Sequence, residues 1–367
     1  MTMTTSDRSA GSDSDTPHFE PSRVLRLAAR ATVAYRHVFA ASRAAPWLSR
    51  PKPVRNWGFD RDLIVAEVRT EAADVVSLKV VSPDGRDLPS WIPGAHLDLI
   101  LPSGKQRQYS LCGDPDDLSS YRIAVRRIDT GLGGSIEVHD SLRAGTSITV
   151  RGPRNAFPLV AADSYLFVAG GIGITPILPM LKRCHDRELP WRLVYLGRSR
   201  ATMPFLDELA RYSRGQVEIR PDDELGPPDI AGIVATASPG SAVYMCGPTP
   251  LMTTARRVMR EIDPTGSLHT ERFSPLPVAD GREFEIHLAR RGATVSVGPD
   301  ETALAAIRRE VPGVAYSCQQ GFCGTCRVRV LAGEVDHRDR ILTHNEREDS
   351  MLICLSRSAG GSLVVDL

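Results

Sequence analysis

The feature that most constrains this chain is a group of cysteines in the stretch "AYSCQQGFCGTCRVRV", residues 315–330. Four residues separate Cys318 from Cys323, two separate Cys323 from Cys326, and Cys354 follows after twenty-seven more. Three thiols in one loop, with a fourth from a distant strand, match the spacing of plant-type [2Fe–2S] sites. The spacing therefore predicts an iron–sulfur cluster held by these four cysteines.

Disulfides and a zinc ion are the alternatives to a cluster. The polar N-terminal stretch, residues 1–20, lacks the apolar core of a signal peptide, so we expect a cytoplasmic protein. Structural disulfides are rare in that compartment, and the chain has an odd number of cysteines, seven. Zinc sites favour paired cysteine hooks or added histidines, which leaves zinc as the weaker alternative. Gly321 and Gly324 would let backbone amides approach the cluster sulfurs.

Length and charge limit the classes of protein to consider. At 367 residues the chain is expected to form about two or three domains. A formal net charge of +1 provides no basic field for nucleic acid, so we expect no nucleic-acid partner. No apolar run approaches the roughly 20 residues that span a bilayer, and no transmembrane segment is expected. We also expect a monomer.

Changes in the sequence pattern divide the chain into four parts. Residues 1–56 should be a disordered tail and a basic helical extension at 22–45, which either packs against the body or docks an acidic partner or membrane surface. Short strand-like runs predict an antiparallel barrel or sandwich over 57–158. Alternating strands and helices predict a parallel α/β domain over 159–273, and strands with one helix surround the cysteine loop over 282–367. The expected fold class is multi-domain, α+β and α/β.

Two stretches of the barrel region could bind a phosphate and an aromatic ring. In "RQYSLCGDP", residues 107–115, Arg107 offers a fork of donors that suits a phosphate, and Tyr109 offers a ring face. A partly buried structural arginine is the plainer alternative. The stretch "TGLGGSIEVHD", residues 130–140, reads as a flexible segment whose amides could cradle an anion. Its candidate residues are Gly133, Gly134 and Ser135.

Two stretches of the α/β region could bind a nucleotide. The turn "VAGGIGITPI", residues 168–177, leads from a strand into a helix whose N-terminus favours phosphate, although it is not the G-x-G-x-x-G fingerprint. Such a turn is equally often a device for tight packing. In "YMCGPTPLM", residues 244–252, Cys246 ends a strand where α/β sheets place ligands, or it is a plain buried cysteine.

Taken in order, these pieces resemble the phthalate dioxygenase reductase and vanillate demethylase oxidoreductase family. The matching signatures are "RQYSL", "GGS", "PRNAFPL", "AGGIGITPI", "YMCGP", "HTERF" and the cysteine loop. The resemblance covers about 57–367 and leaves the N-terminal extension without a counterpart. It implies an antiparallel flavin-binding β-barrel, a parallel nicotinamide-binding α/β domain and a C-terminal β-grasp ferredoxin domain.

The resemblance also implies a role for individual residues. The flavin would be held by Arg107 at its phosphate, by Ser110 near the reactive ring nitrogen, and by Tyr109, Ala124, Val125, Arg126, Gly133, Gly134 and Ser135. The nicotinamide dinucleotide would be seated by Gly170, Gly171, Gly173, Thr175, Cys246 and Gly247. The catalytic set would be Ser110, Cys246 and Phe273, the last shielding the flavin face. The cluster ligands would be Cys318, Cys323, Cys326 and Cys354.

The resemblance implies a reductase that passes electrons from NAD(P)H through a flavin, FMN rather than FAD, to a [2Fe–2S] cluster. A separate Rieske or haem-thiolate oxygenase would then receive them. One alternative is a ferredoxin-like redox sensor or binding module without steady NAD(P)H oxidation. Another is a reductase that acts on a small molecule directly, but no substrate pocket with its own acid or base stands out.

The choice between NADH and NADPH depends on the end of the second α/β strand, "WRLVYLGRSRATMPF", residues 191–205. Arg198, Ser199 and Arg200 follow this strand with no acid before Asp207. Two guanidinium groups and a hydroxyl suit a 2′-phosphate better than a ribose diol. This local chemistry slightly favours NADPH, whereas the resembling reductases are mostly NADH enzymes.

Overall fold

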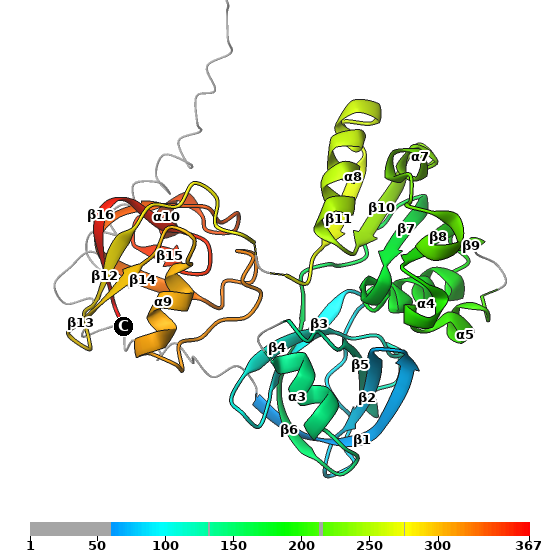
Figure 1. Cartoon of the computed structure of the whole chain (residues 1–367), viewed down its shortest axis with the longest axis horizontal. Helices are drawn as coiled ribbons and strands as arrows, with labels where there is room; N and C mark the ends of the chain where they lie inside the picture. The colour runs from blue at the N-terminus through cyan, green and yellow to red at the C-terminus, as the bar shows by residue number, and fades with distance from the viewer. Residues whose placement is uncertain (1–59, 131–132, 213–215, 275) are drawn as a thin grey trace, which may run out of the picture. The chain divides into compact units, whose positions relative to one another are not determined.

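The structure is a computed structural model that describes residues 60–130, 133–212, 216–274 and 276–367 (Figure 1). The expected disordered tail and the helical extension at 22–45 lie outside these residues. Three β-sheets, each with its own buried apolar cluster or clusters, organise the part of the chain that is described.

The first sheet is antiparallel and has six strands in the order β4-β3-β6-β1-β2-β5. An isolated bridge between Leu111 and Ile123 joins the segment after β4 to β5, the opposite edge strand, and so closes the sheet toward a barrel. Leu63, Leu97 and other aliphatic side chains at alternate strand positions fill its interior. The strands are β1 (Asp60–Ala72), β2 (Val75–Val81), β3 (Ala95–Ile100), β4 (Gln106–Ser110), β5 (Ser120–Arg126) and β6 (Ser147–Asn155).

A short helix replaces the flexible stretch predicted at 130–140. Helix α3 runs from Gly134 to Ser141, and Gly133 precedes it in a left-handed conformation with φ of 75°. Glycine adopts this conformation at little steric cost, which other residues do not. The helix is hard to recognise in the sequence because few of its side chains are apolar; its buried residues are Gly134 and Val138.

The second sheet is parallel, with five strands in the order β11-β10-β7-β8-β9. Apolar clusters cover both of its faces, which explains the nearly continuous apolar runs in its strands. Strand β8, which follows β7 in the chain, lies next to β7 in the sheet, and β10, which comes later, lies on the opposite side of β7. The strand order therefore reverses at β7, and a crevice for ligands is expected where β7 and β10 end. The strands are β7 (Ser164–Gly170), β8 (Trp191–Gly197), β9 (Gln216–Pro221), β10 (Ser241–Cys246) and β11 (Ser267–Glu271). The helices are η2 (Gly171–Ile174), α4 (Leu178–Asp186), η3 (Arg200–Thr202), α5 (Leu206–Leu209), α6 (Asp222–Leu225), α7 (Ile230–Ala235) and α8 (Thr249–Ile262).

The third sheet is mixed and follows the order β13-β12-β16-β14-β15. Strands β12 and β16, the first and the last strand of this sheet in the chain, pair in parallel. Apolar side chains of helix α9 pack in the same buried cluster as those of the sheet. The cysteine loop lies between α9 and β14 in the chain. The strands are β12 (Phe284–Leu288), β13 (Ala293–Val297), β14 (Arg327–Asp336), β15 (Ser350–Leu352) and β16 (Arg357–Val365), and the helices are α9 (Ala303–Glu310) and α10 (His344–Arg347).

The sheets span 60–155, 164–271 and 284–365. The predicted domain boundaries fall between them and stay a prediction. Among the described residues, no helix combines the length and the apolar character needed to cross a bilayer.

A buried arginine ties the third sheet together. Arg357 is only 2% exposed, and its guanidinium donates to the carbonyl oxygens of Glu301 (2.5 Å), Arg282 (2.7 Å) and Gly298 (2.9 Å). It also lies over the Phe284 ring, with its Cζ 5.0 Å from the ring centroid. These bonds connect β16 to the segments that lead into β12 and α9.

We predict that Arg357→Met lowers the free energy of unfolding by about 3–5 kcal/mol, because it leaves buried carbonyl groups without donors. Denaturant titration followed by visible circular dichroism of the cluster-loaded protein measures this. Arg290→Met is the control, since Arg290 pairs with Asp366 at an exposed site and should cost less than about 1 kcal/mol. Equal effects of the two substitutions would contradict the prediction.

Candidate functional site

A cavity of about 440 Å³ brings the predicted flavin residues together with the cysteine loop. Residues of the barrel line it: Gln106, Arg107, Gln108, Tyr109, Ser110, Ala124, Arg126, Ile128, Gly134 and Ser135. Ile172, Thr175 and Phe273 line it from the region of the parallel sheet. Tyr316, Ser317, Cys318 and Gln319 line it from the cysteine loop. One predicted cluster ligand, Cys318, therefore borders the same cavity as the predicted flavin ligands.

The N-terminus of α3 and the Arg107 side chain lie together at this cavity. A Cβ atom on Gly134 would collide with the guanidinium of Arg107, so glycine is required for the arginine to lie there. The first-turn amides of a helix and a guanidinium both favour a phosphate. The Ser135 hydroxyl accepts a hydrogen bond of 3.0 Å from the amide of Ile128, which fixes the preceding segment. These residues fit the phosphate of a flavin nucleotide.

Two of the predicted flavin residues, Val125 and Gly133, are not among the residues that line the cavity. Val125 is fully buried in the barrel interior, and its carbonyl oxygen lies 2.9 Å from Nε2 of His139. Gly133 forms the left-handed turn before α3. Thr175, predicted to bind the nicotinamide nucleotide, instead borders the flavin cavity, where its hydroxyl donates to the carbonyl oxygen of Ile172 at 3.0 Å.

A second cavity, of about 460 Å³, lies where the crevice of the parallel sheet is expected. It is bordered by the ends of β7 and β8, by the turn after β10, and by barrel residues such as Arg126. Its lining includes Gly170, Gly171, Gly197, Arg198, Asp222 and Pro248. Its position is the one in which α/β sheets bind a dinucleotide, and Arg126 borders both this cavity and the flavin cavity.

The glycines of this crevice have two different tasks. A Cβ atom on Gly173 would collide with the backbone of Cys246, and one on Gly170 would lie 2.8 Å from Cδ of Pro248. Gly247 is equally close to Gly170, because its Cβ would lie 3.1 Å from Cα of Gly170. These glycines let the turns after β7 and β10 pack together. Gly171 differs, since it has φ of 54° and an added Cβ would meet no atom within 4 Å.

The basic group after β8 is not arranged as the sequence suggested. Arg198 lines the nucleotide cavity, but Arg200 forms a two-pronged pair with Glu224, with contacts of 2.8 and 3.2 Å. Ser199 is the N-cap of η3 and forms a capping box with Thr202. The structure also brings an acid to the cavity, Asp222, from the end of the next strand. The sequence at the end of β8 does not contain this acid, which is distant from it in the chain.

Glu271 is a functional candidate that the sequence reasoning missed. It lies in the "HTERF" signature at the end of β11, where the strand register pairs it with Cys246 of β10. Its carboxyl accepts a hydrogen bond from the Ser110 hydroxyl, and its Oε2 has no hydrogen-bond partner among the described residues. Desolvation of the carboxyl, whose Oε2 is shielded from solvent although the residue is only half-buried, raises the pKa of Glu271 to about 8, so the carboxyl is largely neutral at pH 7. The signature contained this residue, but nothing in its spacing predicted burial.

Cys246 and Phe273 flank this carboxyl. Burial, with the neighbouring Glu271 carboxylate, raises the pKa of the Cys246 thiol well above its ordinary value, so the thiol stays protonated. Phe273 is half-exposed and borders the flavin cavity. An exposed aromatic ring beside a cavity is consistent with the predicted cover over the flavin.

The four cysteines of the predicted cluster lie in two pairs. The Cys318 thiol is hydrogen-bonded to Cys323, and Cys326 is hydrogen-bonded to Cys354. The first contact lowers the pKa of Cys323 to about 5, which favours the thiolate form that binds metals. Within the described residues, no three His, Cys, Asp or Glu side chains lie close enough together to hold a single metal ion. A pair of thiols for each of two irons is the donor set that a [2Fe–2S] cluster takes.

The glycines of the loop permit this arrangement. Gly321 and Gly324 have φ of 76° and 72°, and the amide of Gln320 donates to Sγ of Cys318 at 3.3 Å. Left-handed glycines turn successive amides toward the sulfurs, and such bonds tune the cluster potential. The residues present therefore fit the cluster.

Comparisons with known proteins agree with this assignment. Residues 286–359 match the family model "2Fe-2S iron-sulfur cluster binding domain". Phenoxybenzoate dioxygenase subunit beta of Ectopseudomonas oleovorans is 40% identical over 302 residues, 81% of this chain and 94% of that protein. The solved structure of phthalate dioxygenase reductase, "a modular structure for electron transfer from pyridine nucleotides to [2Fe-2S]", is 35% identical with a TM-score of 0.65, over 84% of this chain and 98% of that one. An intact type IV self-sufficient cytochrome P450 monooxygenase is 38% identical with a TM-score of 0.68, over 89% of this chain and 44% of that one.

The fold and the sites define a modular oxidoreductase in which a barrel and a parallel α/β domain precede a [2Fe–2S] domain. The chain belongs to the phthalate dioxygenase reductase family. The predicted fold class and reductase class are thereby confirmed, as is the set of cofactors: a flavin, a [2Fe–2S] cluster and a pyridine nucleotide. The roles of individual residues stay predictions.

We predict that Glu271→Gln changes the pH dependence of stability. The unfolded chain loses this proton near its ordinary pKa of 4.5, whereas the folded chain keeps it until about pH 8. The folded state therefore binds more protons over that range, and stability falls as the pH rises through it. When the pH rises from 6 to 8, the free energy of unfolding should fall in both proteins by amounts that differ: the fall in the wild type should exceed that in the variant by about 2–3 kcal/mol.

Urea titrations at pH 6 and pH 8 measure this difference, with exposed Glu334→Gln as the control that leaves the wild-type pH dependence unchanged. A Glu271→Gln variant with the wild-type pH dependence would show that Glu271 is ionised in the folded protein at neutral pH.

Proposed function

We propose that this chain takes electrons from NAD(P)H, passes them through FMN to its [2Fe–2S] cluster, and delivers them to a separate oxygenase. The observation that carries the proposal is the single cavity bordered by Arg107, Thr175 and Cys318, which come from three different sheets and their loops. A flavin bound there would have the nucleotide crevice on one side and a cluster ligand on the other. A redox sensor without NAD(P)H oxidation would need no such crevice.

We assign the flavin site to residues of this chain as follows. Arg107 and the first turn of α3 bind the phosphate, Tyr109 supplies a ring face, and the backbone of Ala124 and Arg126 lines the cavity. When bound, a flavin accepts two electrons as a hydride and releases them one at a time, which a [2Fe–2S] cluster requires. FMN rather than FAD is the proposed form, and its support is the family's C-terminal ferredoxin domain.

The Ser110–Glu271 pair has a proton-holding role in this proposal. A neutral Glu271 holds its proton beside Oγ of Ser110, where the buried serine and the solvent-shielded Oε2 atom of Glu271 limit the access of water. The thiol of Cys246 is buried at the end of β10 and stays neutral. It would fill space between the nicotinamide crevice and the Ser110–Glu271 pair without adding a charge. Phe273 covers the cavity until a nicotinamide ring replaces it.

NADH is the nucleotide that we propose, against the slight preference for NADPH from the sequence. Arg200 is engaged by Glu224, which leaves Arg198 alone among the basic residues after β8 that border the nucleotide cavity. Asp222 adds a carboxylate to the same cavity. A carboxylate accepts hydrogen bonds from a ribose diol and repels a 2′-phosphate.

The acceptor that we propose is an oxygenase. Relatives carry the names of a phenoxybenzoate dioxygenase subunit and of a cytochrome P450 monooxygenase, which supports a Rieske or a haem-thiolate partner. A cytoplasmic location stays part of the proposal.

We predict that kcat/KM for NADH exceeds that for NADPH at least about tenfold, a difference of roughly 1.4 kcal/mol. Asp222→Asn should lower the NADH value and narrow the ratio, because it removes the acceptor for the ribose hydroxyls. Arg200→Ala should leave both values near wild type. A selective loss of NADPH turnover in both Arg198→Ala and Arg200→Ala would instead support a phosphate site.

We predict that Cys323→Ser separates the two halves of the reaction. The variant should still oxidise NADH with an artificial two-electron acceptor, since the nucleotide and flavin cavities lack Cys323 among their lining residues. Reduction of a one-electron acceptor protein should be lost, because the cluster is damaged. Cys184→Ala, in the interior of the α/β domain, is the control that keeps both activities. Equal loss of both activities in a folded, flavin-loaded Cys323→Ser protein would contradict the electron route.

A further inference from the structure

A buried carboxylate lies on the outer face of the barrel. On strand β3, Leu97 and Leu99 point into the barrel interior, so Asp98 between them points outward. Asp98 nevertheless has 0% exposure, and another part of the chain must therefore cover it. A buried carboxylate is costly unless hydrogen bonds or a cation compensate it.

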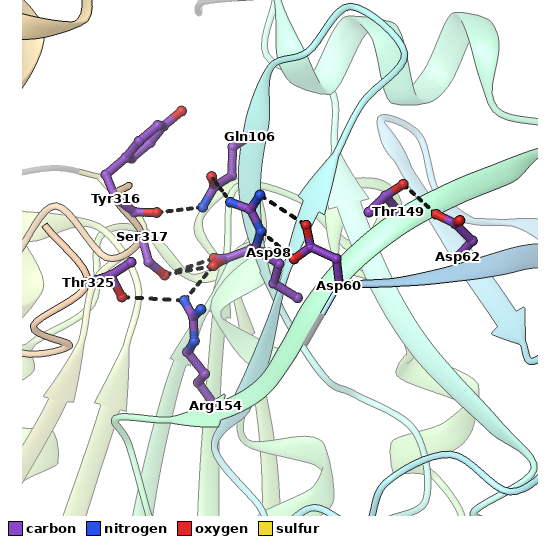
Figure 2. Close-up of polar contacts among 10 residues, drawn as sticks. Asp60, Asp62, Asp98, Gln106, Thr149, Arg154, Tyr316, Ser317 and Thr325 are labelled. Carbon is purple, nitrogen blue, oxygen red and sulfur yellow. Dashed lines mark hydrogen bonds and ion pairs between the residues drawn. The ribbon is translucent and has the colours of Figure 1, made fainter. Parts of the chain in front are cut away.

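The cysteine loop provides this cover (Figure 2). The Ser317 hydroxyl lies 2.9 Å from each oxygen of Asp98, and Nη1 of Arg154 lies 2.7 Å from its Oδ2. The same Arg154 nitrogen reaches Oγ1 of Thr325 at 3.5 Å. Ser317 immediately precedes Cys318, and Thr325 immediately precedes Cys326. One barrel carboxylate thus contacts the loop directly at one end and through an arginine at the other.

Strand β4 extends the same junction. The register pairs Asp98 with Gln108, so both side chains lie on the outer face of the sheet. Nε2 of Gln108 donates to the Ser317 hydroxyl at 2.6 Å, and Nε2 of Gln106 donates to the carbonyl oxygen of Tyr316 at 2.7 Å. The Ser317 hydroxyl can accept from Gln108 and donate to Asp98 at once, since it has one donor and two acceptor positions.

We infer that Asp98 is a positioning residue for electron transfer: it anchors residues 316–326 to the barrel and so keeps Cys318 at the edge of the flavin cavity. The inference rests on the proposed function. Asp98 itself does not border the flavin cavity or the nucleotide cavity. Because electron transfer slows steeply with distance, a loosened loop should slow reduction of the cluster without slowing reduction of the flavin.

The test uses the full chain loaded with flavin and cluster. Asp98→Asn removes the charge, Ser317→Ala removes the hydroxyl bonded to it, and the double variant measures their coupling. Asp62→Asn is the matched control, because Asp62 accepts a hydrogen bond of 2.6 Å from Thr149 on the same barrel at an exposed site (Figure 2). Two readouts are taken: backbone amide hydrogen exchange of residues 316–326, and the separate rates of flavin and cluster reduction after anaerobic mixing with NADH.

In Asp98→Asn we expect exchange in residues 316–326 to be at least about tenfold faster, because charged hydrogen bonds are lost. Cluster reduction should be several-fold slower, while flavin reduction keeps the wild-type rate. The double variant should be no worse than the more damaged single variant, and Asp62→Asn should behave as wild type.

Wild-type exchange and wild-type cluster reduction in Asp98→Asn would overturn the inference, as would fully additive effects of the two substitutions. If Asp98→Asn does not fold, Ser317→Ala decides by the same two readouts, and an unchanged loop and unchanged cluster reduction would count against the anchor. A wild-type protein that fails to reduce its cluster with NADH would refute the proposed function instead, whereas the exchange result would still report on the anchor.

Discussion

Hydrogen bonds join strand β4 to the start of the cysteine loop, and the proposed electron path depends on this junction. All five residues of β4 line the flavin cavity, and two of them, Gln106 and Gln108, also bind the cysteine loop through hydrogen bonds. The chain segment before Cys318 is thereby bound to the same strand that provides the predicted phosphate ligand. In the proposed path, a few residues of this strand would therefore set the distance between flavin and cluster.

Two buried carboxylates illustrate how the structure uses charge around this path. Asp98 meets a guanidinium, Arg154, and a hydroxyl, so burial of its charge is compensated. Glu271 has only the hydroxyl of Ser110, and burial raises its pKa to about 8. The first carboxylate suits a fixed structural junction. The second suits a site that keeps a proton next to a redox cofactor.

Sequence reasoning succeeded where local chemistry decides the structure. The spacing of the cysteines predicted the cluster domain, which the family match over 286–359 confirms, and the apolar runs predicted the parallel sheet. It failed for features that depend on neighbours distant in the chain. The acid of the nucleotide cavity, Asp222, is the first residue of α6, directly after β9, and Glu224 of the same helix pairs with Arg200.

Burial and helix formation were equally hard to predict from local patterns. Glu271 stands in a polar-looking signature, and only the pairing of β11 with β10 buries it beside Cys246. Helix α3 is too short and too polar to show an apolar stripe, and its glycines suggested a flexible segment. For the turn after β7, the sequence left packing and nucleotide binding as equal alternatives. Gly173 serves packing, whereas Gly171 is open to the cavity.

In the proposed path, electrons reach the cluster through a flavin bound in the same molecule. Anaerobic rapid mixing of the loaded protein with NADH, followed at the flavin and the cluster absorption bands, tests this most directly. We expect the flavin band to bleach first and cluster reduction to follow with a first-order rate constant that is independent of protein concentration. Cluster reduction that precedes flavin bleaching, or whose rate rises in proportion to protein concentration, would contradict it.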